Sequence, residues 1–241
     1  MAELIPHEKL LFGLPIELKD FGIIYPPNIS LFLNELEYGR FKRAFSVRKE
    51  LYIDEDSEDY DKLSDLELVI WFDMLDDLIT SLKILYKSDD IKVEKTGSSV
   101  RILINGKHHI DRENYTKFAD LILITLHEGN NIAEEEVKKE LTEIELKMQK
   151  RRKAFERKKA LKEAQEKKEE EPITIFDLAN YVIHSNGSIF NYENVLNLTV
   201  YQLINTFNLY RQKEGYSTFM DYKTSGNFQI EEDMQHWFFN K

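Results

Sequence analysis

Apolar side chains recur at helical spacing in the middle of the chain. The run between residues 64 and 86 has the 3–4 spacing of a buried stripe. The stripe consists of Leu68, Trp71, Leu75, Leu78, Ile79, Leu82 and Leu85. Ser64 precedes this run and Glu67 lies three residues later, which is the spacing of a capping box. The pattern predicts one long amphipathic helix, and a second is predicted at 112–128, with Gly129 as its C-terminal stop.

The apolar spacing changes from helical to alternating between residues 90 and 110. The alternation is interrupted at Gly97-Ser98 and again at Asn105-Gly106, and Asn-Gly is favoured in type I′ hairpin turns. We therefore predict a small antiparallel meander in this region.

The N-terminal region has its own pattern. Residues 9–25 carry Gly and Pro at short intervals, which indicates two short strands, or one strand and a loop. Asn28 or Ser30 is placed to cap a helix over residues 31–47.

The C-terminal region predicts two further helices. Residues 173–185 form the first, which Asn186-Gly187 ends. Thr199 is expected to cap the second, which runs to about residue 216. Its core stripe is expected to contain Val200, Leu203, Ile204 and Phe207, with Tyr210 at its end. A tail rich in aromatic side chains follows.

Residues 133–171 differ in composition from the rest of the chain. They contain 13 Lys and Arg and 12 Asp and Glu, and a short heptad-like seam of apolar residues. The seam consists of Val137, Leu141, Ile144 and Met148. The pattern predicts a charged helical linker with coiled-coil character. The predicted fold is mainly α with a small antiparallel β element. It comprises an α+β N-terminal domain (1–132), this linker (133–171) and a small helical C-terminal domain (172–241).

Composition narrows the classes of function. The chain has 241 residues, a formal charge of −11 and no cysteine, so disulfides and thiol chemistry are excluded. The negative charge disfavours nucleic acid and anionic membranes as partners. We expect no signal peptide and no transmembrane helix, because the chain has neither a basic leader nor 18 consecutive apolar residues. The expected location is the cytoplasm.

The sequence contains only weak signals for a metal site or a catalytic site. His108 and His109 are adjacent on a predicted strand and point to opposite faces, and no third ligand has a useful spacing. The acidic run 54–59 lacks the glycine and glutamate of an EF-hand loop, so we expect a solvated loop. Asp73, Asp76 and Asp77 are expected on a solvated helix face. Without a phosphate-binding, dinucleotide or nucleophile motif, we expect no catalytic residue, no metal site, no cofactor and no enzyme activity.

Three stretches together resemble a known family. The segment "PIELKDFGIIYPPNISLFLNELEYGRFKRAFSV" is similar to the opening of a group of phage tail proteins. The segment "HIDRENYTKFADLILITLHEGN" resembles their middle helix, and "LNLTVYQLINTFNLYRQKEGY … HWFFNK" resembles their close. The chain therefore resembles the tail assembly chaperones of tailed phages or prophages of Gram-positive bacteria. The long charged segment 133–171 is a departure from the pattern of that family.

The resemblance implies a non-catalytic role in tail assembly. Such chaperones bind the aggregation-prone tape measure protein and help recruit tail tube subunits in the host cytoplasm; self-association is a further expectation. We predict partner contact at residues outside the core stripe and in the tail. They are Tyr201, Leu209, Trp237 and Phe238.

Two alternatives stay open. The protein could instead remain in the virion as a structural component of the tail or baseplate. It could also bind nucleic acid through the basic cluster 150–159, with Phe155 available for stacking.

Overall fold

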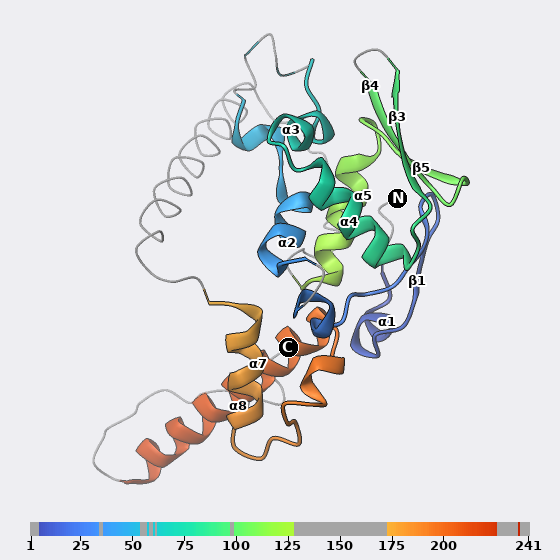
Figure 1. Cartoon of the computed structure of the whole chain (residues 1–241). Coiled ribbons are helices and arrows are strands. Elements are labelled where there is room, and N and C mark those ends of the chain that lie inside the picture. Colours follow the sequence, from blue (N-terminus) through green and yellow to red (C-terminus); the bar gives the residue numbers. More distant parts are fainter. Residues whose placement is uncertain are drawn as a thin grey trace.

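The computed structural model describes residues 5–33, 36–53, 57, 60, 62–96, 99–127, 173–225 and 236. It is a mixed α+β fold, mainly helical, with two small antiparallel sheets (Figure 1). The N-terminal elements are α1 (His7–Leu11), β1 (Ile16–Leu18), β2 (Gly22–Ile24), the 3-10 helix η1 (Ile29–Leu33), α2 (Tyr38–Ser46) and η2 (Lys49–Leu51). The central elements are α3 (Asp65–Trp71), α4 (Leu75–Tyr86), β3 (Ile91–Thr96), β4 (Ser99–Ile104), β5 (His108–Ile110) and α5 (Tyr115–Thr125). The C-terminal elements are α7 (Ile175–His184), η3 (Val195–Asn197) and α8 (Val200–Ser225).

The predicted meander is confirmed. Strand β4 pairs with β3 on one side and β5 on the other, both antiparallel. Asn105 and Gly106 both have positive φ, 52° and 65°, as a type I′ turn requires. Of the two alternatives for residues 9–25, the structure has the two short strands, β1 and β2, which pair antiparallel; α1 before them was not predicted. The predicted turn at Gly97-Ser98 lies outside the described residues.

The capping box before α3 is confirmed. The Glu67 backbone N–H donates to Ser64 Oγ at 3.3 Å, and the Ser64 N–H donates to Glu67 Oε2 at 2.7 Å. These two bonds satisfy backbone donors that the first turn of a helix leaves free.

The prediction of one helix over 64–86 is wrong, because the chain breaks after Trp71. Asp73 takes the left-handed conformation, with φ of 57°. Its N–H donates to the carbonyl of Ile70, and the N–H of Met74 donates to that of Val69, both at 3.0 Å. This is a Schellman closure with aspartate where glycine is usual. It buries both Val69 and Met74, which the straight helix would separate.

The helix predicted over 31–47 is also divided. Its first part is the 3-10 helix η1, and α2 begins only at Tyr38. Neither expected cap starts a long helix, because Asn28 instead forms an isolated antiparallel bridge with Thr199. Pairing with a distant segment therefore replaces the local capping signal.

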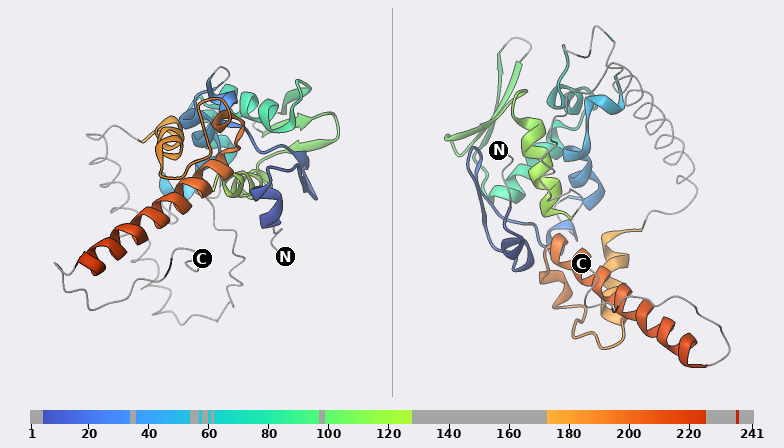
Figure 2. Two further views of the ribbon diagram at one scale, coloured as in Figure 1. Left: turned by 90° about the horizontal axis from the view of Figure 1, so that it is seen from below. Right: turned by 180° about the vertical axis from the view of Figure 1, so that it is seen from behind.

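The core lies where α2, α4 and α5 meet, with the three-stranded sheet on the far side of α4 and α5 from α2 (Figures 1 and 2). The rings of Phe41 and Phe45 pack at 5.4 Å between centroids, and Phe118 is 5.0 Å from Phe21. Each of these four rings is fully buried. Tyr86 closes this core by donating its hydroxyl to the carbonyl of Phe21 at 2.8 Å.

The C-terminal helices begin where the sequence predicted. Thr174 and Asp177 form a capping box for α7, and Gly187 follows it with φ of 77°. Thr199 accepts from the Gln202 N–H at 3.2 Å at the start of α8. The predicted core stripe is confirmed, with Val200 and Leu203 fully buried and Ile204, Phe207 and Tyr210 packed partly buried against the core.

Helix α8 is longer than predicted. It reaches Ser225, so the first part of the aromatic tail is helical. Its distal half projects from the body of the molecule in every view (Figures 1 and 2). The predicted stop of the 112–128 helix at Gly129 is wrong, because α5 ends at Thr125 and His127 takes the left-handed conformation, with φ of 61°. The predicted linker, its seam and the cluster 150–159 lie outside the described residues. The three-part division of the chain therefore stays a prediction.

Candidate protein-interaction surfaces

Tyr201, a predicted contact residue, lies inside the molecule. It is 7% exposed, its hydroxyl is 3.0 Å from His7 Nδ1, and its ring centroid is 4.7 Å from that of His127. The exposure expected from helical spacing is therefore wrong. The reason is that the first turns of α8 lie between α7 on one side and α1 on the other, so more than one face is covered. Burial also raises the pKa of the Tyr201 phenol.

Leu209 is placed as predicted on an accessible part of α8, with 45% of its surface exposed. Met220 and Tyr222 are exposed further along the same helix. Trp237 and Phe238, the remaining predicted contacts, lie outside the described residues. We call the exposed apolar residues Leu209 and Met220, which lie on one face of α8 because eleven residues make about three turns, the α8 surface.

The base of the α8 surface is fixed to the helix before it. Tyr181 of α7 donates its hydroxyl to Glu214, and this bond raises the pKa of the phenol. Lys213 Nζ donates to the carbonyl of Asn186 at 3.4 Å. The rings of Tyr181 and Phe207 pack at 4.9 Å between centroids. Helix α8 is thus held along its middle as well as at its start, and its distal half projects from the body (Figures 1 and 2).

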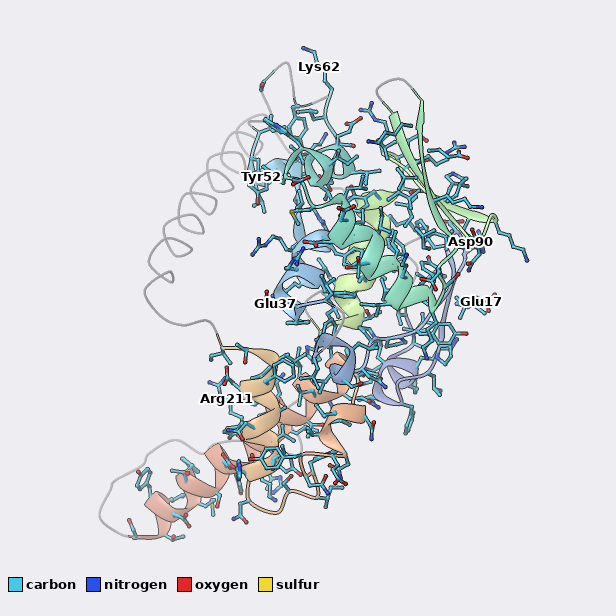
Figure 3. All side chains as sticks on the ribbon, in the orientation of Figure 1. Glu17, Glu37, Tyr52, Lys62, Asp90 and Arg211 are labelled. Carbon is cyan, nitrogen blue, oxygen red and sulfur yellow. The ribbon has the colours of Figure 1, made fainter. Side chains whose placement is uncertain are left out.

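A second exposed surface lies at the opposite end of the molecule. It contains Leu51, Tyr52, Trp71 and Phe72, and we call it the aromatic patch. Trp71 is 72% exposed and Tyr52 59%. The two labelled residues Tyr52 and Arg211 of Figure 3 show how far the patch lies from α8.

The rings of the aromatic patch contact one another. The rings of Trp71 and Phe72 are nearly parallel and stacked, with centroids 6.0 Å apart and 6° between their planes. Tyr52 packs on Phe72 at 4.9 Å with a tilt of 58°. Sequence reasoning missed this surface because it placed Trp71 in the core stripe. The available signal was the adjacency of Trp71 and Phe72, which cannot both face one core from one helix.

A small polar cavity beside α3 has a structural role. Its volume is about 190 Å³, and it is lined by Lys49, Glu50, Leu63, Ser64, Asp65, Arg112 and Thr116. The buried Asp65 carboxylate accepts from the Lys49 N–H and from Thr116 Oγ1, each at 2.7 Å. These bonds tie η2, α3 and α5 together and leave the carboxylate fully engaged.

The histidine pair and the aspartates of α4 are placed as follows. His108 is half-buried and His109 exposed on β5, as predicted. Across the described ranges, no three His, Cys, Asp or Glu side chains gather to hold a metal ion. Asp77 departs from the predicted solvated face, because Arg40 binds it through two hydrogen bonds of 3.1 and 2.5 Å. In the same part of the chain, no helix has the length and apolar character needed to cross a bilayer.

Comparison with known proteins identifies one related domain. A family model described as the YomV second domain, from a protein of a Bacillus phage region, matches residues 165–240. The match covers α7, η3 and α8, about a third of the chain. No curated protein and no solved structure matches. The C-terminal segment is therefore similar to a phage-region domain.

Proposed function

We propose that the protein is a non-catalytic phage tail morphogenesis protein that binds the tape measure protein, tail tube subunits or both during tail assembly. One observation carries this proposal. The segment that is similar to the YomV second domain, residues 165–240, also resembles the close of tail assembly chaperones. Two separate likenesses to phage proteins thus fall on one segment.

The geometry of that segment supports protein binding. Helix α8 presents Leu209 and Met220 on one face, and its first half is anchored in the body. A helix fixed at its base presents side chains with little loss of conformational freedom on binding. Such a helix can pair with the apolar face of another helix. A tape measure protein is expected to be a long helical partner of this kind.

The proposal is tested by co-expression with the tape measure protein of the same phage. We expect more soluble tape measure protein and a complex that co-purifies at low salt. Leu209→Asp should lower the affinity by roughly tenfold or more, because it places a charge in an apolar contact. Ile189→Asp is the matched control, because Ile189 is also exposed in the C-terminal segment but lies in the loop before η3.

The proposal would be contradicted if the protein formed no complex with the tape measure protein and none with the tail tube protein. Mass spectrometry of purified particles separates the two assembly roles. An assembly factor of the host cytoplasm is absent from finished virions, whereas a structural tail component is retained in them.

A further inference from the structure

We propose that the aromatic patch (Leu51, Tyr52, Trp71 and Phe72) is a second docking site, which takes a cationic amphipathic segment of a partner protein. The chemistry of the patch is argued independently of the proposed function. Only the expectation that the partner is a phage tail protein rests on that function.

The patch is held in a fixed shape by the backbone beneath it. The Schellman closure at Asp73 ends α3 directly after Trp71 and buries Met74, so Trp71 and Phe72 are left on the outer side of the break. Leu51 is the last residue of η2 and Tyr52 follows it, where the Tyr52 N–H donates to the carbonyl of Lys49 at 3.0 Å. Rigid, adjacent aromatic side chains lose little entropy when a partner covers them.

The segment that bears the patch carries most of the net negative charge of the chain. Residues 48–77 contain 3 Lys and Arg and 12 Asp and Glu, a net charge of −9 out of −11 for the whole chain. Among these acidic residues, Asp73 and Asp76 are exposed directly after Trp71 and Phe72. The net charge of this segment favours cationic over phosphate-bearing partners, which disfavours nucleic acid and anionic lipid as occupants.

Exposed aromatic rings in an acidic setting match one ligand chemistry. Lysine and arginine bind through their charge to carboxylates and ring faces, while their aliphatic stems cover apolar surface. The same pairing occurs next to the patch, where Lys49 Nζ lies 3.9 Å from the centroid of the Tyr60 ring. An amphipathic helix with lysine or arginine beside an apolar stripe satisfies both the aromatic and the acidic part of the patch.

The chain offers its own reporter for this site. It contains two tryptophans, so Trp237→Phe leaves Trp71 as the only one. In that background, the full-length protein is titrated with a synthetic amphipathic helix built from leucine and lysine. We expect a saturable change in the fluorescence emission of Trp71. The affinity derived from it should fall by roughly tenfold between about 50 and 300 mM salt. A helix of the same pattern built from leucine and glutamate should cause no change.

Variants of the otherwise native chain, measured by calorimetry, locate the site. Trp71→Ala should lower the affinity for the leucine–lysine helix by roughly tenfold or more. Phe12→Ala is the matched control, because Phe12 is also 72% exposed but lies beside α1; its affinity should be unchanged. Equal binding of the glutamate helix, or equal affinity of the Trp71→Ala protein, would overturn the proposal. Binding of the lysine helix without binding of any tail protein would leave the patch chemistry standing and contradict the proposed function.

Discussion

Asn28 and Thr199 form an antiparallel bridge that joins the segment before α2 to the start of α8. Two backbone bonds flank it: the Ile29 N–H donates to Leu198 at 3.0 Å and the Val200 N–H to Pro27 at 3.1 Å. The described C-terminal helices therefore share a backbone-bonded interface and one hydrophobic core with the N-terminal elements. The interface thus joins the two regions that the sequence predicted as separate domains, 1–132 and 172–241.

This interface predicts that the chain survives cleavage of its middle segment. A specific protease site inserted at residue 150 should yield two fragments that still elute as one species in gel filtration under native conditions. The reason is that backbone bonds and a shared apolar core hold the parts together without the covalent link. Separation of the fragments in native buffer would contradict this interface. As a control for complete cleavage, the two fragments should separate when the same sample is run in denaturant.

Gln202 is predicted to stabilise the same interface. Its Oε1 accepts from the Thr199 N–H at 2.9 Å, and its Nε2 donates to the carbonyl of Leu11 at 2.8 Å. Gln202→Ala should lower the free energy of unfolding by about 1–2 kcal/mol, measured by urea denaturation, because both bonds are partly buried and lost together. Gln212→Ala, at an exposed position of the same helix, should change it by less than about 0.5 kcal/mol.

The features that were predictable from sequence are those that local bonds determine. The Ser64–Glu67 box and the Asn105-Gly106 turn each depend on residues within three positions of one another, and both are confirmed. The break at Asp73 was missed because glycine, the usual stop signal, is absent there. The gain that favours the break is burial of Met74, which no local pattern reports.

The interaction surfaces were predictable only in part. The placement of Leu209 follows from its distance from the core stripe, and it is exposed. Tyr201 has a similar offset from the stripe, yet it is buried because His7 and His127 reach it from elements that are far away in sequence. Trp71 fails in the opposite direction, since its helix ends before the predicted stripe continues. In both cases tertiary packing overrides helical periodicity.

Two buried tyrosines predict a loss of stability at alkaline pH. Burial raises the pKa of Tyr86 and of Tyr115 above the ordinary value of 10.0. Below pH 10 both phenols are neutral in the folded and unfolded chains, so their contribution to stability is complete. Above pH 10 the unfolded chain ionises first, and the free energy of unfolding should fall as pH rises. Urea denaturation between about pH 9 and 11 measures this slope.

Tyr86→Phe tests the assignment of that slope. At pH 7 it should cost about 1 kcal/mol, because the hydroxyl no longer donates to Phe21 and leaves that carbonyl without the bond. Above pH 10 the decline should be shallower than in the native protein. An equal slope in the Tyr86→Phe and native proteins would contradict the assignment.

Gly22 is predicted to be intolerant of a side chain, in contrast to Gly215. Gly22 has φ of 82°, and a Cβ there would lie 2.7 Å from His108 Nε2, where β2 approaches β5. Gly22→Ala should therefore destabilise the protein by about 2 kcal/mol through backbone strain and this contact. The double variant Gly22→Ala, His108→Ala should remove the clash with the imidazole but keep the backbone strain, so it should regain only part of the lost stability. Gly215 lies within α8 with no atom near its Cβ position, so Gly215→Ala should stabilise by about 0.5–1 kcal/mol. Thermal unfolding of the three variants checks both signs, and a stabilising Gly22→Ala would contradict the observed approach of the two sheets.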